Sequence, residues 1–407
     1  MTARPLDGVR VVEVAMWGFV TSAGAVLADW GADVIKVEHA VTGDPQRGLK
    51  RTGAFVVDGD INVNFEHPNR GKRSVGVDIG TDSGRALLDE LIKTADVFLT
   101  SLLPSARRKF RIEVDDVRAV NPKVIYARGS ALGARGDEAE RGGYDMTAFW
   151  CRAATAQSLT PPDIDGIIGP PAPAYGDTIS GTNLAGGIAA ALFARERGGE
   201  PSVVDVSLLG SGLWSMGLAV DSSIMANKPA VAAPTGVRAA LNPLTAMYRT
   251  SDGRYISLVM LQPMRYWAEF CQHIDRPELA DDDRFNSYAA LEHNSAAACE
   301  AIADAIASQP LAHWSARFAT MSGPWAPVQD TLQAAADPQI RQNGYITSVK
   351  AADGSDFELV ASPVQFDGAD PDLRRAPLFA EHTDDVLQSL GYDMDKIIEL
   401  KIEGAIT

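Results

Sequence analysis

The chain has 407 residues, 46% of them hydrophobic, so it is long enough for two or three hydrophobic cores. Its formal net charge of −16 disfavours nucleic-acid binding and requires any anion site to gather basic residues locally. No run approaches the ~18 apolar residues of a membrane span, and no apolar signal core opens the chain. Three distant cysteines predict reduced thiols in a cytoplasmic protein, and the six histidines show no spacing typical of metal ligands.

The first third of the chain alternates strands with helices. Strand, helix and strand in compact order form a βαβ unit, which requires a parallel sheet. The predicted strands are residues 9–14, 32–37, 96–100 and 123–127, and the predicted helices are residues 22–30, 81–94 and 115–119. This order predicts a Rossmann-like α/β domain, although the Gly-x-Gly-x-x-Gly dinucleotide fingerprint is absent.

Asp177 stands between two stretches of small residues, 171–176 and 178–187. A helix follows, over about residues 184–197. An aspartate at its start is typical of a helix cap, whereas small neighbours let another backbone or a ligand approach closely. The residues alone leave both roles open.

A second region begins after residues 226–240, which are rich in Ala, Pro and Val and are typical of a linker. Residues 246–258 predict two short strands joined by an Asp-Gly turn. Helices are predicted at 264–274, 296–308 and 311–321. Strands and loops return near Trp325, and a helix is predicted around 384–390.

Short motifs recur in a characteristic order along nearly the whole chain. They occupy residues 5–11, 27–38, 43–45, 69–75, 121–126, 143–145, 242–244, 248–250, 252–253, 283–285, 337–339 and 381–384. In order and spacing they resemble the family III CoA-transferases, the group that includes formyl-CoA transferase, carnitine CoA-transferase and α-methylacyl-CoA racemase.

The resemblance implies a large Rossmann-like domain with a parallel sheet, made of residues 1–225 and 330–407, and a smaller α+β domain of residues 226–329. Two such chains interlock as linked rings, so a homodimer is expected. Asp177 falls on the family's catalytic aspartate. The implied reaction transfers coenzyme A from an acyl-CoA donor to a carboxylic acid acceptor through an aspartyl-CoA thioester. CoA and acyl-CoA are then substrates, and no cofactor is permanently bound.

The resemblance also implies positions that contact CoA. They are Gly18, Phe19, His39, Val77, Gly80, Ser101, Leu102, Lys109, Ser130, Leu132 and Tyr144. Many members of the family have Lys where this chain has Gly80, and Asn-Phe where it has Ser101-Leu102. Basic candidates for the phosphates are Arg70, Lys72, Arg73, Arg107, Arg108, Lys109 and Arg111, although a solvated face is the commoner role of any one of them.

The turn after the first strand is bulkier than the family's usual Ala-Gly-Pro turn, because it contains Trp17 and Phe19. Phe149 and Trp150 add apolar bulk after residues 143–145. These aromatics either belong to the core or line the cleft, in which case the acyl group is larger or more apolar than formate or oxalate. The glycine-rich loop of some members is missing, since residues 226–241 contain only Gly236.

Two alternatives remain. The racemase branch of the family has a Gly-His-Asp motif where this chain has Tyr144, and tyrosine, with an ordinary pKa of about 10, is a poor base at neutral pH. A non-catalytic acyl-CoA-binding protein is the other alternative, and the retained Asp177 argues against it. The sequence therefore favours a transferase.

Overall fold

The computed structural model describes residues 4–53, 55–236 and 240–407, and the chain forms two compact units. The larger unit contains Met1–Gln157, Ile168–Ala230 and Pro338–Thr407, and the smaller contains Ser158–Ile167 and Val231–Asp337. None of the helices within the described residues combines the length and the hydropathy needed to span a bilayer.

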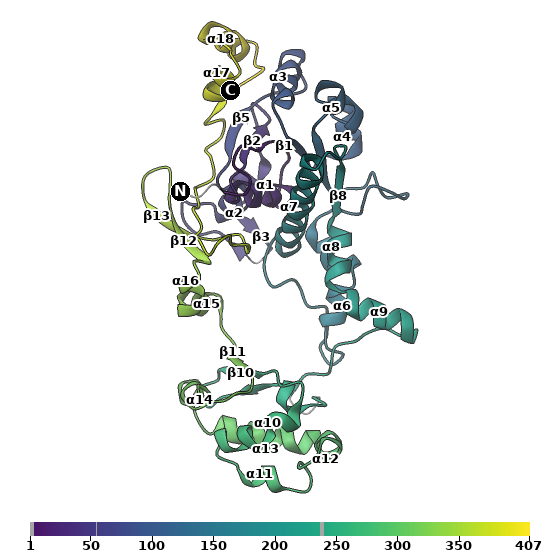
Figure 1. Ribbon diagram of the computed structural model, residues 1–407, viewed down its shortest axis with the longest axis vertical. Coiled ribbons are helices and arrows are strands. Elements are labelled where there is room, and N and C mark those ends of the chain that lie inside the picture. The colour runs from purple at the N-terminus through teal and green to yellow at the C-terminus, as the bar shows by residue number, and fades with distance from the viewer. Residues whose placement is uncertain (1–3, 54, 237–239) are drawn as a thin grey trace. The chain divides into compact units, whose positions relative to one another are not determined.

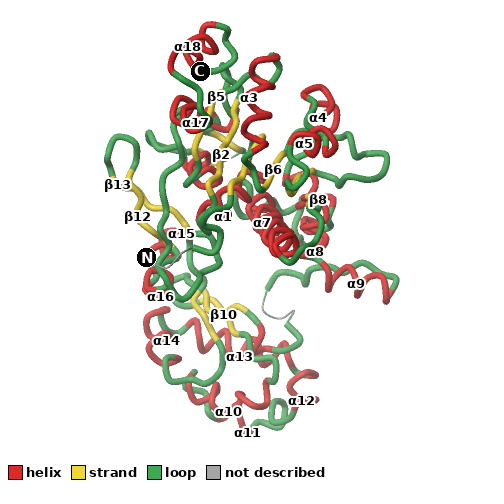
Figure 2. The backbone as a smooth tube through the Cα atoms, turned by 45° about the horizontal axis from the view of Figure 1, so that its top comes forward, coloured by secondary structure: helices red, strands yellow, loops and turns green. Residues whose placement is uncertain are grey.

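A six-stranded parallel sheet forms the centre of the larger unit (Figures 1 and 2). In spatial order its strands are β5 (Arg73–Gly76), β2 (Asp33–Glu38), β1 (Arg10–Val14), β6 (Val97–Thr100), β7 (Ile125–Ser130) and β8 (Val203–Ser207). The parallel α/β sheet predicted from the sequence is thereby confirmed. The strand order reverses between β1 and β6, and such a switch point leaves a crevice at the carboxyl ends of these strands.

Helices cover both faces of this sheet. Alternate strand residues point to opposite faces, so Val11 and Leu99 join one core with helices α1 (Phe19–Asp29) and α7 (Tyr175–Glu196). Val12 and Phe98 join the other core, which is covered by α3 (Asp82–Lys93), α5 (Val114–Val120), α17 (Thr383–Ser389) and α18 (Met394–Ile402). Helix α18 was not predicted from the sequence, and α1 begins three residues earlier than predicted.

The remaining elements of the larger unit are short. They are Pro45–Gly48, β3 (Arg51–Thr52), β4 (Phe55–Val56), α2 (Val63–Asn69), α4 (Pro104–Phe110), a π-helix at Met146–Arg152, α8 (Leu208–Ser215), α9 (Gly217–Ala226), α16 (Pro338–Gln342), β12 (Ile346–Lys350) and β13 (Asp356–Val360). Helix α6 (Thr155–Leu159) lies where the two units meet along the chain. The last residues return to the sheet, where the Thr407 N–H donates to the Gly76 carbonyl (3.1 Å).

The smaller unit has an antiparallel three-stranded sheet of β9 (Met247–Arg249), β10 (Tyr255–Leu258) and β11 (Trp325–Pro327). The predicted turn between β9 and β10 contains Gly253 at φ 79°, which glycine adopts without strain. The helices of this unit are α10 (Pro263–His273), α11 (Glu278–Asp281), α12 (Tyr288–His293), α13 (Ser295–Ala307), α14 (Leu311–Phe318) and α15 (Thr331–Ala336), preceded by a 3-10 turn at Pro243–Thr245 (Figure 1).

Helices α1 and α7 lie side by side in the larger unit and approach closely because Gly181 has no side chain (Figures 1 and 2). A Cβ atom at Gly181 would lie 2.6 Å from the Ser22 Cβ and 2.8 Å from the Phe19 carbonyl oxygen. Backbone atoms cannot rotate away from such a clash, so the separation of the two helices depends on this glycine.

Two glycine-to-alanine substitutions on α7 are therefore expected to change stability in opposite directions. Gly181→Ala lowers the free energy of unfolding by about 1–3 kcal/mol, because the added methyl group overpacks the contact with α1. Gly186→Ala is the matched control: a Cβ atom there meets nothing within 4 Å, so it raises stability by up to about 1 kcal/mol through helix propensity. Urea denaturation of both variants measures the difference, and equal shifts would contradict the close packing.

Candidate active site

A cavity of about 800 Å³ opens at the carboxyl edge of the parallel sheet. The ends of β1, β6 and β7 contribute Met16, Ser101 and Ser130 to its wall. Seven of the residues predicted from the sequence line it, namely Phe19, Ser101, Leu102, Ser130, Leu132, Tyr144 and Asp177. The cavity therefore adjoins the switch point of the sheet, where ligands of open α/β folds bind.

The turn between β1 and α1 forms one side of the cavity. Its Met16 N–H donates to the Ser101 hydroxyl (3.1 Å), which joins the ends of β1 and β6. Trp17 has φ 68°, a left-handed conformation that is costly for a bulky residue. The Trp17 and Tyr144 rings meet edge to face, with centroids 5.9 Å apart, and both line the cavity.

Asp177 lies inside the first turn of α7 and does not cap the helix. The cap position is Ala174, at φ 56°, and it makes no side-chain cap hydrogen bond. The Gly176 N–H in this first turn instead donates to the Asp145 carboxylate. The cap role that the sequence left open for Asp177 is thus wrong, because α7 begins at Tyr175, well before the predicted start.

Gly18 directly contacts the Asp177 carboxylate. A Cβ atom at Gly18 would lie 2.5 Å from Oδ2 of Asp177, so any larger residue would displace the carboxylate or the turn. The spacing along the two helices explains the approach: Gly18 and Ser22 on one, and Asp177 and Gly181 on the other, are each four residues apart and share a face. The Gly181 contact with Ser22 therefore brings Asp177 against Gly18.

Burial and, to a smaller extent, the nearby Asp145 carboxylate together raise the pKa of Asp177 to about 7. Within the described residues, no cation or hydrogen bond offsets this effect. Burial also raises the pKa of Asp145, although hydrogen bonds from the Met146 and Gly176 amides oppose the change. The site thus contains a carboxylate whose charge is poorly stabilised, as in many catalytic sites. Asp145 belongs to the motif at residues 143–145, from which no role was predicted for its carboxylate.

Four arginines also line the cavity, and three of them, Arg128, Arg141 and Arg152, were not identified from the sequence. Arg128 pairs with Asp205, and Arg141 and Arg152 share Glu138. The fourth, Arg107, is buried, donates to the Leu102 carbonyl (2.8 Å) and pairs with Glu113 (3.2 Å). Four arginines against the three acids Asp205, Glu138 and Glu113 leave one net positive charge at the cavity wall, in a protein whose net charge is −16.

Gly18, in contact with Asp177, adjoins the cavity, whereas His39, Val77, Gly80 and Lys109 do not line it. His39 is exposed and its Nδ1 accepts the Val41 N–H (3.2 Å). Val77 is 1% exposed, because its strand end pairs with Ile406 of the returning C-terminal segment. Gly80 and Lys109 both lie beside Phe110: the Lys109 Nζ is 5.2 Å from the ring centroid.

Several other sequence candidates have structural contacts elsewhere. Arg70 pairs with Asp29, Arg73 pairs with Asp33, and Lys72 is fully buried beside Glu13. None of these three basic side chains lines the cavity.

Phe149 and Trp150 do not line the cavity either. They are 2% and 4% exposed, and Phe149 packs against Gly176 at the start of α7. Of the two roles that the sequence left open for these aromatics, Phe149 and Trp150 have the core role, whereas Trp17 and Phe19 line the cavity wall. Among the described residues, no three His, Cys, Asp or Glu side chains gather as metal ligands would.

Known proteins are similar to this chain in sequence and in fold. A sequence model described as CoA-transferase family III matches residues 6–383. An (R)-2-hydroxy-4-methylpentanoate CoA-transferase of Clostridioides difficile is 29% identical, covering 97% of this chain and 98% of its own. A cinnamoyl-CoA:phenyllactate CoA-transferase of Clostridium sporogenes is 27% identical, with coverage of 97% and 95%. The solved structure of a CAIB/BAIF family protein from Brucella suis is 28% identical and superposes with a TM-score of 0.80, covering 96% of this chain and all of the other.

The raised pKa of Asp177 predicts a pH-dependent stability. Between the ordinary pKa of 3.8 and the folded value of about 7, the native state keeps a proton that the unfolded chain has lost. Asp177 therefore lowers the free energy of unfolding as the pH rises through this window, with no further loss above it. Asp177→Asn removes the titrating group, so the variant should exceed the wild type in stability at pH 8 and approach it near pH 4. Urea denaturation across this range tests this, and parallel profiles would contradict it.

Proposed function

The chain belongs to CoA-transferase family III, as predicted from its sequence, and we propose that Asp177 is the nucleophile with which it transfers coenzyme A from an acyl-CoA to a carboxylic acid. As a transferase of acyl-CoA metabolism it takes CoA thioesters as substrates. The observation that supports the role of Asp177 is its carboxylate, which contacts Gly18 at the wall of the cavity and has no charge partner in the described residues.

The cavity has the features that such a substrate needs. Its volume of about 800 Å³ is within the range of pockets that enclose small molecules and cofactors. Four arginines at its wall suit the phosphates of CoA, and Asp177 marks the position of the thioester. Four predicted CoA positions outside the cavity, His39, Val77, Gly80 and Lys109, stay predictions.

The proposed chemistry proceeds by carboxylate exchange. An Asp177 oxygen attacks the thioester carbonyl, the C–S bond breaks, and a mixed anhydride and CoA thiolate form. The thiolate then attacks the aspartyl carbonyl, releasing the donor acid and leaving an aspartyl-CoA thioester. The acceptor carboxylate repeats both steps in reverse and regenerates Asp177. Each exchange is nearly thermoneutral, because one carboxylate replaces another.

The position of Asp177 suits both halves of this cycle. It adjoins the start of α1, whose first intrahelical hydrogen bond is from the Ser22 N–H to the Gly18 carbonyl. Amides earlier in that turn lack intrahelical partners and can stabilise the oxyanions that form beside Asp177. Burial that raises the pKa of the carboxylate also makes its anion more nucleophilic.

Helix α9 supports a homodimer. It contains no buried residue, although its sequence is mostly apolar. Leu218 is 89% exposed and Met225 is 88% exposed. Apolar surface of this kind marks protein–protein contact, and in a homodimer a second copy of the chain covers it. The homodimer and the cytoplasmic location stay predictions.

Replacing Asp177 with alanine is expected to lower kcat for CoA transfer by at least about 10⁴-fold, because the covalent route is lost. In the wild type, hydroxylamine added with acyl-CoA alone should modify Asp177, as detected by mass spectrometry. Light scattering should show a dimer of the 43.4 kDa chain for both proteins. A folded variant with near wild-type turnover would contradict the nucleophile.

Deuterium exchange in heavy water, measured on the same samples, distinguishes a racemase from a transferase. Tyr144 lines the cavity where the racemase branch has histidine, so we expect no catalytic exchange of the α-proton of a 2-methylacyl-CoA. Deuterium uptake without an acceptor acid would assign the chain to the racemase branch, and the absence of both activities would favour a binding protein.

The apolar wall predicts the acyl group. The Trp17 indole lines the same cavity as Asp177 and packs against the Tyr144 ring, and buried apolar area contributes about 25 cal/mol per Å². The two relatives named above act on branched and ring-bearing acids by name, which supports the same preference here. We expect higher kcat/KM with a branched or phenyl-bearing acyl-CoA than with formyl-CoA. Trp17→Ala should reduce that advantage about tenfold, and a wild-type preference for formyl-CoA would refute the prediction.

A further inference from the structure

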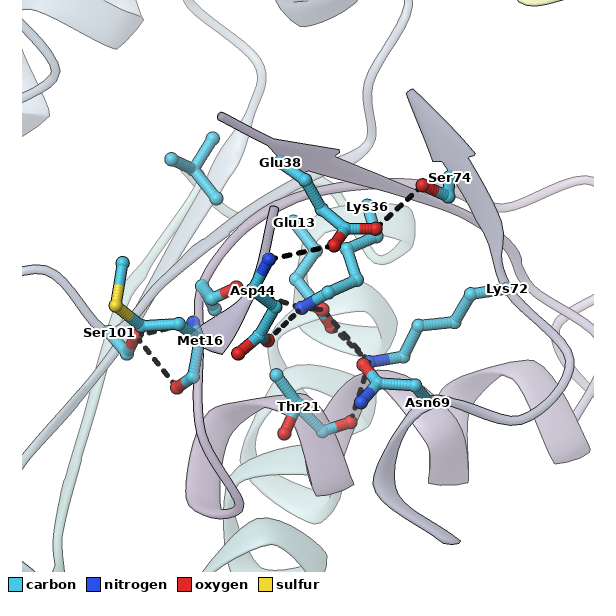
Figure 3. A network of polar contacts seen from close by, with 12 residues as sticks. Glu13, Met16, Thr21, Lys36, Glu38, Asp44, Asn69, Lys72, Ser74 and Ser101 are labelled. Carbon is cyan, nitrogen blue, oxygen red and sulfur yellow. Dashed lines mark hydrogen bonds and ion pairs between the residues drawn. The ribbon is translucent and has the colours of Figure 1, made fainter. Parts of the chain in front are cut away.

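A buried network of charged side chains adjoins the turn between β1 and α1, which contains Trp17 and Gly18. Figure 3 shows this network beside Met16 and Thr21, which flank these two residues. Three acids and three bases make up its charges: Glu13, Glu38, Asp44, Lys36, Arg47 and Lys72. None of the six lines the cavity. Buried ion pairs contribute little net stability, because desolvation offsets their attraction. Stability alone therefore does not explain why these charges are buried here.

The network holds the turn at three successive points. On the strand side, the Lys36 Nζ donates to the Ala15 carbonyl (2.9 Å). At the strained residue itself, the Trp17 N–H donates to Oδ1 of Asp44 over 3.5 Å. On the helix side, the Lys72 Nζ donates to the Thr21 carbonyl (2.8 Å). Gly18, which contacts Asp177, lies between the second and third points.

The same side chains are fixed to the sheet. Lys36 on β2 pairs with Asp44 (2.8 Å) and with Glu13 on β1 (3.3 Å). Glu13 also accepts from Lys72, at 2.8 and 2.9 Å. Lys72 in turn donates to Asn69 of α2 (3.0 Å). The side chains that contact the turn are therefore bonded to residues of β1 and α2.

Trp17 makes this support necessary. A tryptophan at φ 68° keeps a strained conformation only where its surroundings impose it. Without that support, the turn relaxes toward ordinary backbone angles and moves Gly18 relative to Asp177. A carboxylate nucleophile depends on such placement, because small displacements of a reacting group slow a reaction strongly.

We propose that the Lys36–Asp44 ion pair is a positioning device of the active site, which fixes Trp17 so that Gly18 stays against Asp177. Neither side chain touches the reacting atoms; both act through the backbone of the turn. The expected effect on kcat rests on the proposed function of Asp177. The expected effect on the conformation of Trp17 does not.

The test uses the charge-balanced double variant Lys36→Met/Asp44→Leu. It leaves two acids and two bases in the network, so no buried charge loses its partner, and Leu removes Oδ1, which accepts the Trp17 and Gln46 N–H groups. The matched control is Arg195→Met/Asp96→Leu, which removes an ion pair of the same length (2.8 Å) near the other end of α7, together with the acceptor of the Arg10 N–H. Crystal structures and the kcat and KM for acyl-CoA are measured for both.

In the double variant, we expect Trp17 to leave its positive φ and kcat to fall about 10- to 100-fold, with KM unchanged. The control should keep the wild-type turn, kcat and KM. A double variant with wild-type φ at Trp17 and wild-type kcat would overturn the proposal, as would an equal kcat loss in the control. If the double variant does not fold, Asp44→Ala alone carries the same test, because it removes the acceptor of the Trp17 N–H while Lys36 retains Glu13.

The Asp177→Ala variant in the same assay separates this proposal from the proposed function. Retained transfer by Asp177→Ala would overturn the nucleophile, and the crystallographic conformation of Trp17 would still decide whether the ion pair holds the turn. Asp177-dependent transfer with unchanged kinetics in the double variant would overturn only the positioning role.

Discussion

The site depends on the close approach of two helices through small residues. Gly181 lets α7 contact α1 at Ser22, and one turn earlier the same approach brings Asp177 against Gly18. Residues four apart share a helix face. The packing of Gly181 on Ser22 and the contact of Asp177 with Gly18 therefore depend on the same separation of α1 and α7. A protein interior has little free space to absorb a shift, so a methyl group at either glycine would move the carboxylate.

Two kinds of charge environment adjoin the same turn. In the network, acids and bases alternate, and Arg47 with the nearby lysine keeps the pKa of Glu38 below its ordinary value despite burial. At Asp177 no base is present among the described residues, and burial together with Asp145 raises the pKa to about 7. Burial acts on both carboxyl groups in the same direction, because loss of water disfavours the charged form of Glu38 and of Asp177. The two environments differ in where cations lie. Lys36 and Lys72 donate to backbone carbonyls of the turn, whereas no cation offsets the charge of the Asp177 carboxylate among the described residues.

Much of the fold follows from local pattern. The β-branched runs of β1 and β2 are short-range features and lie as predicted, and α3 lies within the predicted residues 81–94. The Thr81 hydroxyl caps α3 by accepting the Gly84 N–H. Helix α18 was missed, although Asp393 caps it, because its residues alternate apolar and charged side chains without a strong period. The π-helix at Met146–Arg152 has no reliable sequence pattern, since such helices form where tertiary packing inserts a residue.

The sequence by itself determined the parallel α/β architecture, the family and the residue types of the site, because these depend on patterns that motifs and periodicity carry. Tertiary structure alone decided that Asp177 is not a cap, that Phe149 and Trp150 pack in the core, and that Arg128 and Arg152 face the cavity. It also decided that Lys72 is buried in a charge network. The physical reason is that burial, charge pairing and pKa depend on neighbours distant in sequence, which only the packed chain brings within reach.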